Sequence, residues 1–273
     1  ALKGMVTRMK KRIISLLIAA ALAMTGNIGI PVLAEDSLHA AVTGDCIVNN
    51  TIAVDTNASG SASYEWYIAD SLEGEYVKLK SADESVLNIM PWYAARWMKA
   101  KVSDGEKDVW TEPVQEKSKR TTLNSGGASA AVGTRWYNFP NSCSSGYVSV
   151  ELEYKKEAGS GAGCAFMFLD TDRNNYVANK TTFWGGSLLS ELDGKTLMSG
   201  ADDGVWHTLN FSIDLSKNPK LMKVYIDNGA TLKSDVSTYQ SSEMGGLMVD
   251  LSGVGFEYKN LSISHVRLPS TPP

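Results

Sequence analysis

Cysteine, histidine and long helical periodicities are all scarce in this 273-residue chain. The three cysteines are Cys46, Cys143 and Cys164, and so sparse and odd a set does not make a disulfide framework. Cys143 and Cys164 pair only if their strands are neighbours, and buried thiols are the alternative. No C-x-x-C motif occurs and the three histidines are scattered, which argues against a zinc site.

Basic residues are also in short supply once the amino-terminal segment is set aside. Residues 1–34 hold five of the 26 basic residues and none of the 30 acidic ones, so the rest carries 21 basic residues and a formal charge of −9. A chain of that charge repels phosphate backbones, and no stripe of Lys and Arg offsets the repulsion. Nucleic acid is therefore not an expected partner.

The amino-terminal segment has the layout of a secretory signal. A basic cluster from Arg8 to Arg12 precedes the apolar run "IISLLIAAALAM", and a small-residue end follows. A transmembrane helix needs about 20 apolar residues, and Gly26, Asn27 and Pro31 interrupt this run too early. We expect a signal helix over residues 1–34 with cleavage after Ala34. No second apolar span follows, so we expect a secreted or cell-surface protein without a membrane span in its mature part.

The remainder shows no sustained period of 3.6 residues. Short alternating apolar runs are separated by Gly, Ser, Asn and Asp, which favours all-β sandwiches. The polar, glycine-rich stretch "VQEKSKRTTLNSGGASAAVG" divides it into two modules, residues 35–117 and 118–273. The closing "RLPSTPP" is typical of a Pro/Thr linker. We expect a modular protein with a further, catalytic domain after this chain.

The first module contains "YEWY", "DSLEGEYVKL" and "MKAKVSDGEKDVWTEPV". These pieces resemble the bacterial immunoglobulin-like repeats of secreted surface proteins, whose fold is a β-sandwich. The resemblance implies that Trp66 fills the centre of the core and that the module is a spacer. Its departure from the repeats is "MPWYAARWM", which stands where they have a small polar-glycine turn. Tyr67 and Trp92 are expected outside the core, where they would contact the next module.

The second module alternates in "GYVSVELEYKK" and carries "FLDTDRNNY", "DGVWHTLNFSIDLSKNPKLMKVYIDNG" and "GVGFEYKNLSI". Together these resemble a concanavalin A-like jelly roll of the laminin G-like group. The last of them predicts one long strand with a bulge near Lys259. The resemblance implies a β-sandwich and leaves the ligand open.

An enzyme is one alternative for this module. Glu151 and Glu153 are two residues apart on one strand, so their side chains point the same way, about 7 Å apart. Such a pair suits a glycosidase or a polysaccharide lyase. The related hydrolases, however, carry three acids on that strand, and here Ser149 and Lys155 flank the pair. A solvated strand face is the favoured interpretation, and the chain is not expected to be an enzyme in these residues.

Calcium is the only cofactor that the sequence suggests. Asp170, Asp172 and Asn174 place oxygen ligands at every second position of "DTDRN". Asn175 and Thr181 stand where an EF-hand needs its glycine and its bidentate acid, so the loop is not an EF-hand. A structural calcium and a polar turn closed by hydrogen bonds both remain open.

Exposed flat rings in loop-like contexts predict where a sugar would bind, because aromatic faces and a few polar groups are what such sites need. The candidates are Trp184, Tyr176, Trp136 and Tyr239. Trp184, ahead of Gly185 and Gly186, is the strongest of them, and Trp206 is expected to be structural. The sequence as a whole predicts a secreted, non-catalytic bacterial protein that binds a polysaccharide or surface glycan. A structural or adhesive surface protein is the second alternative.

Overall fold

The computed structural model describes residues 37–266 apart from 81, 125–128, 179, 191–193, 218–219, 228–229 and 238–242. The signal segment and Tyr239 lie outside the described residues. From His39 onward the chain belongs to one compact unit. Across the described ranges the only helix is the single 3-10 turn η1, Pro91–Tyr93, and the rest of the regular structure is antiparallel strand, so the all-β prediction is confirmed.

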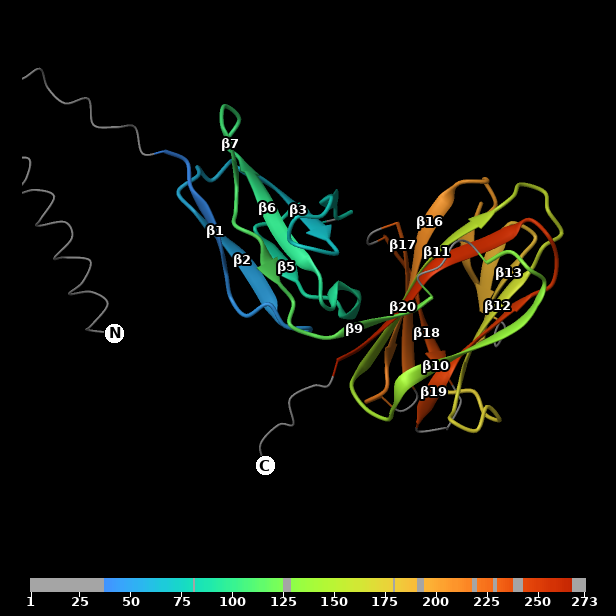
Figure 1. The fold of residues 1–273 in the computed structure, drawn as a ribbon. Helices are drawn as coiled ribbons and strands as arrows, with labels where there is room; N and C mark the ends of the chain where they lie inside the picture. The colour runs from blue at the N-terminus through green and yellow to red at the C-terminus, as the bar shows by residue number, and fades with distance from the viewer. Residues whose placement is uncertain are drawn as a thin grey trace, which may run out of the picture. The chain divides into compact units, whose positions relative to one another are not determined.

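The N-terminal sandwich is built from two sheets (Figure 1). One has the order β1-β2-β5, with β1 at Ala40–Thr43, β2 at Thr51–Thr56 and β5 at Val86–Asn88. The other has the order β4-β3-β6-β7, with β4 at Val77–Lys78, β3 at Ser63–Ala69, β6 at Trp97–Ser103 and β7 at Asp108–Trp110, and β8 at Val114–Gln115 also pairs with β6.

Trp66 lies at the centre of this core, as predicted. It is fully buried among side chains of both sheets, including Ile52 and Met98, and its indole N–H donates a hydrogen bond to the Glu84 carbonyl at 2.9 Å. Burial of so large an apolar surface is worth on the order of 3 kcal/mol. The immunoglobulin-like identity of the module remains a prediction.

The C-terminal sandwich has two sheets of six strands. The first, called here the β11 sheet, has the order β18-β17-β16-β11-β20-β9. Its strands are β9 (Arg120–Asn124), β11 (Tyr147–Lys156), β16 (Trp206–Asp214), β17 (Lys220–Ile226), β18 (Ala230–Ser237) and β20 (Phe256–Val266). The second, the β12 sheet, has the order β10-β19-β12-β13-β14-β15. Its strands are β10 (Gly133–Cys143), β12 (Cys164–Leu169), β13 (Thr181–Trp184), β14 (Ser187–Ser190), β15 (Thr196–Ser199) and β19 (Met244–Leu251).

The two sheets of the C-terminal sandwich pack through one aromatic core. Alternate residues of β11, namely Val148, Val150, Leu152 and Tyr154, are fully buried in it, as the alternation in the sequence predicts. Phe166 and Phe211 meet across the sheets with ring centres 5.3 Å apart. Pairing of β10 with β19 and of β11 with β20 joins distant parts of the chain, the arrangement of a jelly-roll β-sandwich.

The structure also tests the predicted bulge and the state of the cysteines, of which Cys143 and Cys164 lie in this sandwich and Cys46 in the N-terminal one. The register of β20 against β11 shifts between Glu151 and Glu153, and Asn260 takes a positive φ of 53° there, so the bulge predicted near Lys259 is confirmed. All three cysteines are buried thiols rather than disulfides. Burial raises the pKa of the Cys164 thiol well above its usual value, which keeps it in the unreactive protonated form.

Candidate functional site

Three of the four rings proposed as ligand contacts lie on one surface, the outward face of the β12 sheet. The strand pairing places Trp136, Met248 and Met167 in one row across β10, β19 and β12. Trp184 lies on the same face at the far end of β13, and Tyr176 packs with Trp136 and Met248 over Met167. We call this surface the aromatic face. Its two ends are about 13 Å apart along the strands and about 14 Å apart across them, long enough for an oligosaccharide.

Trp184 is the most exposed tryptophan on this face, with 64% of its surface accessible. It stands at the β13–β14 turn, where Gly185 and Gly186 take positive φ values of 52° and 79°. A Cβ on Gly163 would lie 3.6 Å from the Trp184 ring and 2.7 Å from the Ser252 hydroxyl. The bare backbone of Gly163 therefore makes room for the Ser252 hydroxyl, and the Trp184 ring lies within van der Waals distance of the same position.

The other end of the aromatic face is more tightly packed. The Arg173 guanidinium lies 4.5 Å from the centre of the Trp136 ring, and the indole N–H donates to the Asn138 side chain. The Tyr176 hydroxyl lies 3.6 Å from the Met167 sulfur. Both rings are partly buried, so each offers less accessible surface than Trp184 does.

Polar side chains lie between these ends. The Thr134 hydroxyl donates a 2.7 Å hydrogen bond to the Asp250 carboxylate, and both residues occupy the row between Trp184 and Trp136. Asp202 lies against Gly186, beside the Trp184 turn. An exposed ring flanked by hydroxyl and carboxylate groups is the composition that a sugar site requires. The sequence placed these rings in loops, whereas Trp136 and Trp184 belong to strands.

The loop proposed for calcium is closed by its own hydrogen bonds. One carboxylate oxygen of Asp170 accepts from the Asn174 backbone N–H at 2.9 Å, and the other accepts from the Asn175 side chain at 2.6 Å. The Asn175 side-chain bond lowers the pKa of Asp170, and backbone N–H groups of the loop add to the effect. In the described part of the chain no cluster of three or more Asp, Glu, His or Cys could hold a metal ion. These contacts fit a polar turn, and calcium at Asp170, Asp172 and Asn174 stays a prediction.

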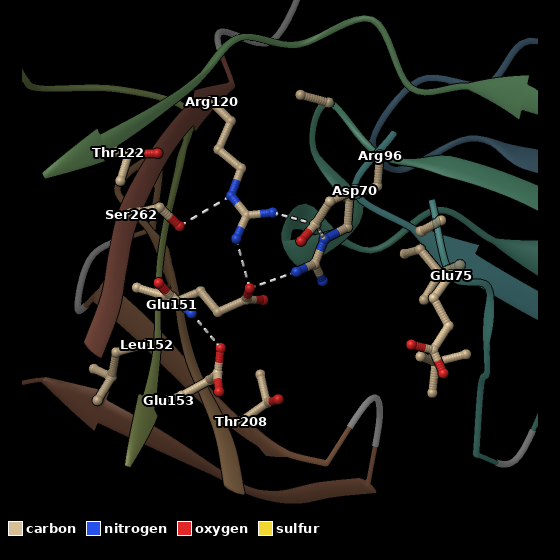
Figure 2. A pocket seen from close by; sticks show the side chains of 15 residues that line it. Asp70, Glu75, Arg96, Arg120, Thr122, Glu151, Leu152, Glu153, Thr208 and Ser262 are labelled. Atoms are coloured by element: carbon tan, nitrogen blue, oxygen red, sulfur yellow. Dashed lines mark hydrogen bonds and ion pairs between the residues drawn. The ribbon is translucent and has the colours of Figure 1, made fainter. Parts of the chain in front are cut away.

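A cleft of about 700 Å³ separates the N-terminal sandwich from the outward face of the β11 sheet (Figure 2). At one end of this cleft, two arginines donate hydrogen bonds to the carboxylate of Glu151. Arg120 donates to Glu151 at 2.6 Å and to Asp70 at 2.6 Å. Arg96 donates to the same Glu151 oxygen and, at 2.9 Å, to the same Asp70 oxygen.

This network corrects the interpretation of Glu151 as part of a solvated strand face. Glu151 is only 8% exposed, because the N-terminal sandwich covers this end of the sheet. Glu153 lies nearer to solvent, pairs with Lys259 at 3.2 Å and accepts a hydrogen bond from Asn260. Both carboxylates of the enzyme alternative are thus already engaged by cationic or amide groups of the chain.

Other polar residues of the β11 sheet are buried in the same contact. Asn210 donates to the Ser149 hydroxyl at 2.8 Å and accepts from Ser212 at 3.0 Å, and all three are at most 4% exposed. Trp92 is buried, and its ring lies 6.0 Å from that of Tyr225 on β17. Trp92 therefore contacts the next module, as expected, but it belongs to the buried cluster of the N-terminal sandwich, so its expected position outside the core is wrong.

Electrostatics strengthen the contact between the sandwiches. Desolvation by neighbouring atoms disfavours the charged form of Asp70, although its side chain is still 70% exposed, but the positive charges of Arg96 and Arg120 outweigh this and hold the pKa of the carboxyl below its usual value. Sequence reasoning missed Asp70, Arg96 and Arg120. No local pattern marks them, because the partners are 26 to 55 positions apart along the chain.

His207 is a second titratable group that the sequence did not single out as functional. Its ring nitrogens lie 2.8 Å from Asp227 and 3.0 Å from Asp203, and the ring stacks on Tyr154. Burial lowers the pKa of His207, but the hydrogen bonds to the two carboxylates outweigh this and raise it overall. Because both ring nitrogens of His207 are hydrogen-bonded to carboxylates, we assign the residue a structural role at the edge of the core.

Neither protein-family models nor curated proteins match this chain. Solved structures give partial likenesses. A sialidase is 10% identical, with 62% of this chain covered and a TM-score of 0.42, and the match spans about a fifth (21%) of that protein's length. The carbohydrate-binding module CBM66 from Bacillus subtilis is 16% identical, with 54% of this chain and 96% of the module covered and a TM-score of 0.35.

The alginate lyase AlgAT5, of polysaccharide lyase family 7, is 11% identical, with 74% of this chain and 95% of the lyase covered and a TM-score of 0.36. At these scores neither the fold nor the function of this chain rests on the likenesses. Among the residues that the structure describes, no helix has the length and apolar character needed to cross a membrane.

Proposed function

We propose that this chain is the non-catalytic, carbohydrate-binding front part of a secreted modular protein, and that the aromatic face is its glycan-binding surface. The observation that carries the proposal is the exposure of Trp184 on the same sheet face as Trp136 and Tyr176. Leaving a tryptophan 64% exposed forgoes on the order of 2 kcal/mol of burial. Such an exposed ring beside polar groups is typical of a ligand surface.

The engagement of Glu151 supports a binding role over catalysis. A general acid or nucleophile has to be able to exchange a proton or attack a sugar carbon. Here the Glu151 carboxylate accepts from two guanidinium groups and is 8% exposed. The N-terminal sandwich is proposed as an immunoglobulin-like spacer, and residues 1–34 as the export signal. A catalytic domain beyond the present chain would use the glycan contact to stay near its substrate.

A glycan array probed with the wild type and with Trp184→Ala tests the proposal. Trp110→Ala is the matched control, because Trp110 is also exposed, at 44%, but lies on the N-terminal sandwich. We expect glycan signals that Trp184→Ala lowers at least tenfold and Trp110→Ala leaves within twofold. An array without hits, together with binding to a protein partner, would favour the adhesive alternative. Release of reducing sugar by the wild type and not by Glu151→Gln would favour the enzyme.

A further inference from the structure

The cleft between the N-terminal sandwich and the β11 sheet has the size of a small-molecule site. Its volume of about 700 Å³ falls inside the range of about 300–1,000 Å³ that ligand pockets occupy. Glu153, Thr208 and Asn260 line it from the C-terminal sandwich, and Glu75 and Val77 line it from the N-terminal one. Figure 2 shows Glu75 across the cleft from Glu153 and Thr208.

The polar groups of the cleft define the chemistry of what it can hold. Arg96 is 6% exposed, and its Nη1 has no hydrogen-bond partner in the part of the chain that the structure describes. A guanidinium only donates hydrogen bonds and a carboxylate only accepts them. The buried Arg96 nitrogen is out of a ligand's reach, but the Thr208 hydroxyl and the Asn260 amide in the lining can donate. A ligand that meets these donors and also the carboxylates of Glu75 and Glu153 therefore needs groups that both accept and donate, as hydroxyls do.

The charge of the cleft further restricts the kinds of ligand that it can bind. Its ionised lining residues are Asp70, Glu75, Glu151 and Glu153 against Arg96 and Arg120. Lys259 also pairs with Glu153 at 3.2 Å, so the four acidic groups exceed the three basic ones by one, and Glu75 and Asp70 face solvent. Such a site repels uronates and sulfated sugars and accepts uncharged ones.

We infer that this cleft is a second carbohydrate site, specific for a neutral, hydroxyl-rich glycan segment and separate from the aromatic face. The inference rests on the proposed function, because it assumes that the chain is a glycan binder. It assigns Glu75 and Glu153 as acceptors for sugar hydroxyls, and it makes the sandwich–sandwich contact a part of the site. The Arg–Glu network then holds the two walls of the cleft at a fixed spacing.

The test uses isothermal titration calorimetry on the whole chain. The probes are cellohexaose, mannohexaose, xylohexaose and chitohexaose, with hexagalacturonate as the charged comparison. Glu75→Lys puts a long cationic side chain into the wall of the cleft. Glu73→Lys is its matched control, because Glu73 is exposed in the same loop but does not line the cleft. Both positions are at the surface, so the fold should tolerate both changes.

At least one neutral hexasaccharide is expected to occupy two sites on the wild type. Glu75→Lys should weaken one site at least fivefold, Glu73→Lys should leave both within twofold, and hexagalacturonate should not bind the Glu75-sensitive site. The Trp184→Ala variant should lose the site on the aromatic face and keep the site in the cleft, which is the one that Glu75→Lys weakens.

The two proposals fail in different ways. A single site that Trp184→Ala removes and Glu75→Lys leaves unchanged would overturn the inference and keep the proposed function. Equal binding of hexagalacturonate at the Glu75-sensitive site would also overturn it. Absence of binding by all four neutral probes would overturn the inference, whereas the proposed function would fall only if the glycan array also gave no hits.

Discussion

On the β11 sheet the outward side chains are polar and buried, whereas on the β12 sheet they include an exposed tryptophan. Ser149, Glu151 and Asn210 lie under the N-terminal sandwich, each at most 8% exposed, and each has a hydrogen-bond partner. Trp184 stays 64% exposed on the opposite sheet. If burial followed hydrophobicity alone, Trp184 would be buried and these polar side chains would be exposed. The difference shows that the β11 face is covered by a contact within the chain, and it supports the proposal that the β12 face meets a ligand.

The largest expected effect concerns the contact within the chain. Glu151→Ala leaves the guanidiniums of Arg96 and Arg120 without their shared carboxylate. The Arg96 side chain is 8% exposed and that of Glu151 is 11% exposed, so we expect a loss of about 3 kcal/mol in the free energy of unfolding. Chemical denaturation followed by circular dichroism measures it.

Glu153→Ala is the control for that change. Glu153 is on the same strand face, but its side chain is 33% exposed and its partner Lys259 is 30% exposed. The expected loss is less than about 1 kcal/mol. Equal losses for the two variants would contradict the distinction between a buried and a solvated end of this face.

The Asp70 carboxylate should make the contact sensitive to acid. Its pKa in the folded chain lies below the unfolded value of about 3.9, because Arg96 and Arg120 outweigh the effect of burial. Its stabilising contribution is therefore complete above that unfolded value and is lost as the pH falls through the folded pKa. The melting temperatures of the wild type and Asp70→Asn should differ at pH 7 and converge as the pH falls below the unfolded pKa of about 3.9 and through the lower folded one. A difference that stays constant would show that Asp70 does not couple to the arginines.

His207 should respond to pH in the opposite direction, because it is a base held by two carboxylates, whereas Asp70 is an acid held by two arginines. Its folded pKa is raised above the unfolded value of about 6.5, since its bonds to Asp227 and Asp203 outweigh burial. Its contribution is complete below pH 6.5 and is lost as the pH rises through the folded pKa. The stabilities of the wild type and His207→Gln, measured by thermal denaturation from pH 5 to 9, should converge at high pH. Stabilities that differ more at high pH than at low pH would contradict the assignment of a raised pKa to His207.

The smallest expected effect concerns calcium at the turn beside the β12 sheet. Because Asp170 already accepts hydrogen bonds from Asn174 and Asn175, we expect added calcium to shift the melting temperature by less than about 1 °C. Differential scanning fluorimetry with calcium and with EDTA measures the shift. A rise of several degrees that Asp172→Asn removes would establish the calcium site instead.

The sequence predicted the features that depend on neighbours along the chain. The burial of Val148 follows from local alternation, that of Trp66 was implied by the resemblance of its short motif to immunoglobulin-like repeats, and the bulge predicted near Lys259 lies at Asn260. The burial of Glu151 could not be predicted. It depends on Arg96, 55 positions away, and on which surface of the jelly roll the N-terminal sandwich covers.

The aromatic candidates show the same limit. Each of Trp136, Tyr176 and Trp184 was proposed from its own short context, and nothing in those contexts says that they share a sheet face. That follows only from the pairing of β10 with β19, of β19 with β12 and of β12 with β13. Sequence reasoning can therefore nominate single rings, whereas their grouping into a site requires the strand order.

Hydroxyl-radical footprinting with the neutral hexasaccharide that binds best is the most direct test of the aromatic face. Trp184 and Trp110 are 64% and 44% exposed, so both should be oxidised in the free protein. We expect the sugar to lower the oxidation rate of Trp184 at least threefold and to leave that of Trp110 unchanged. Equal rates at Trp184 with and without a bound sugar would contradict the assignment of the aromatic face as the glycan-binding surface.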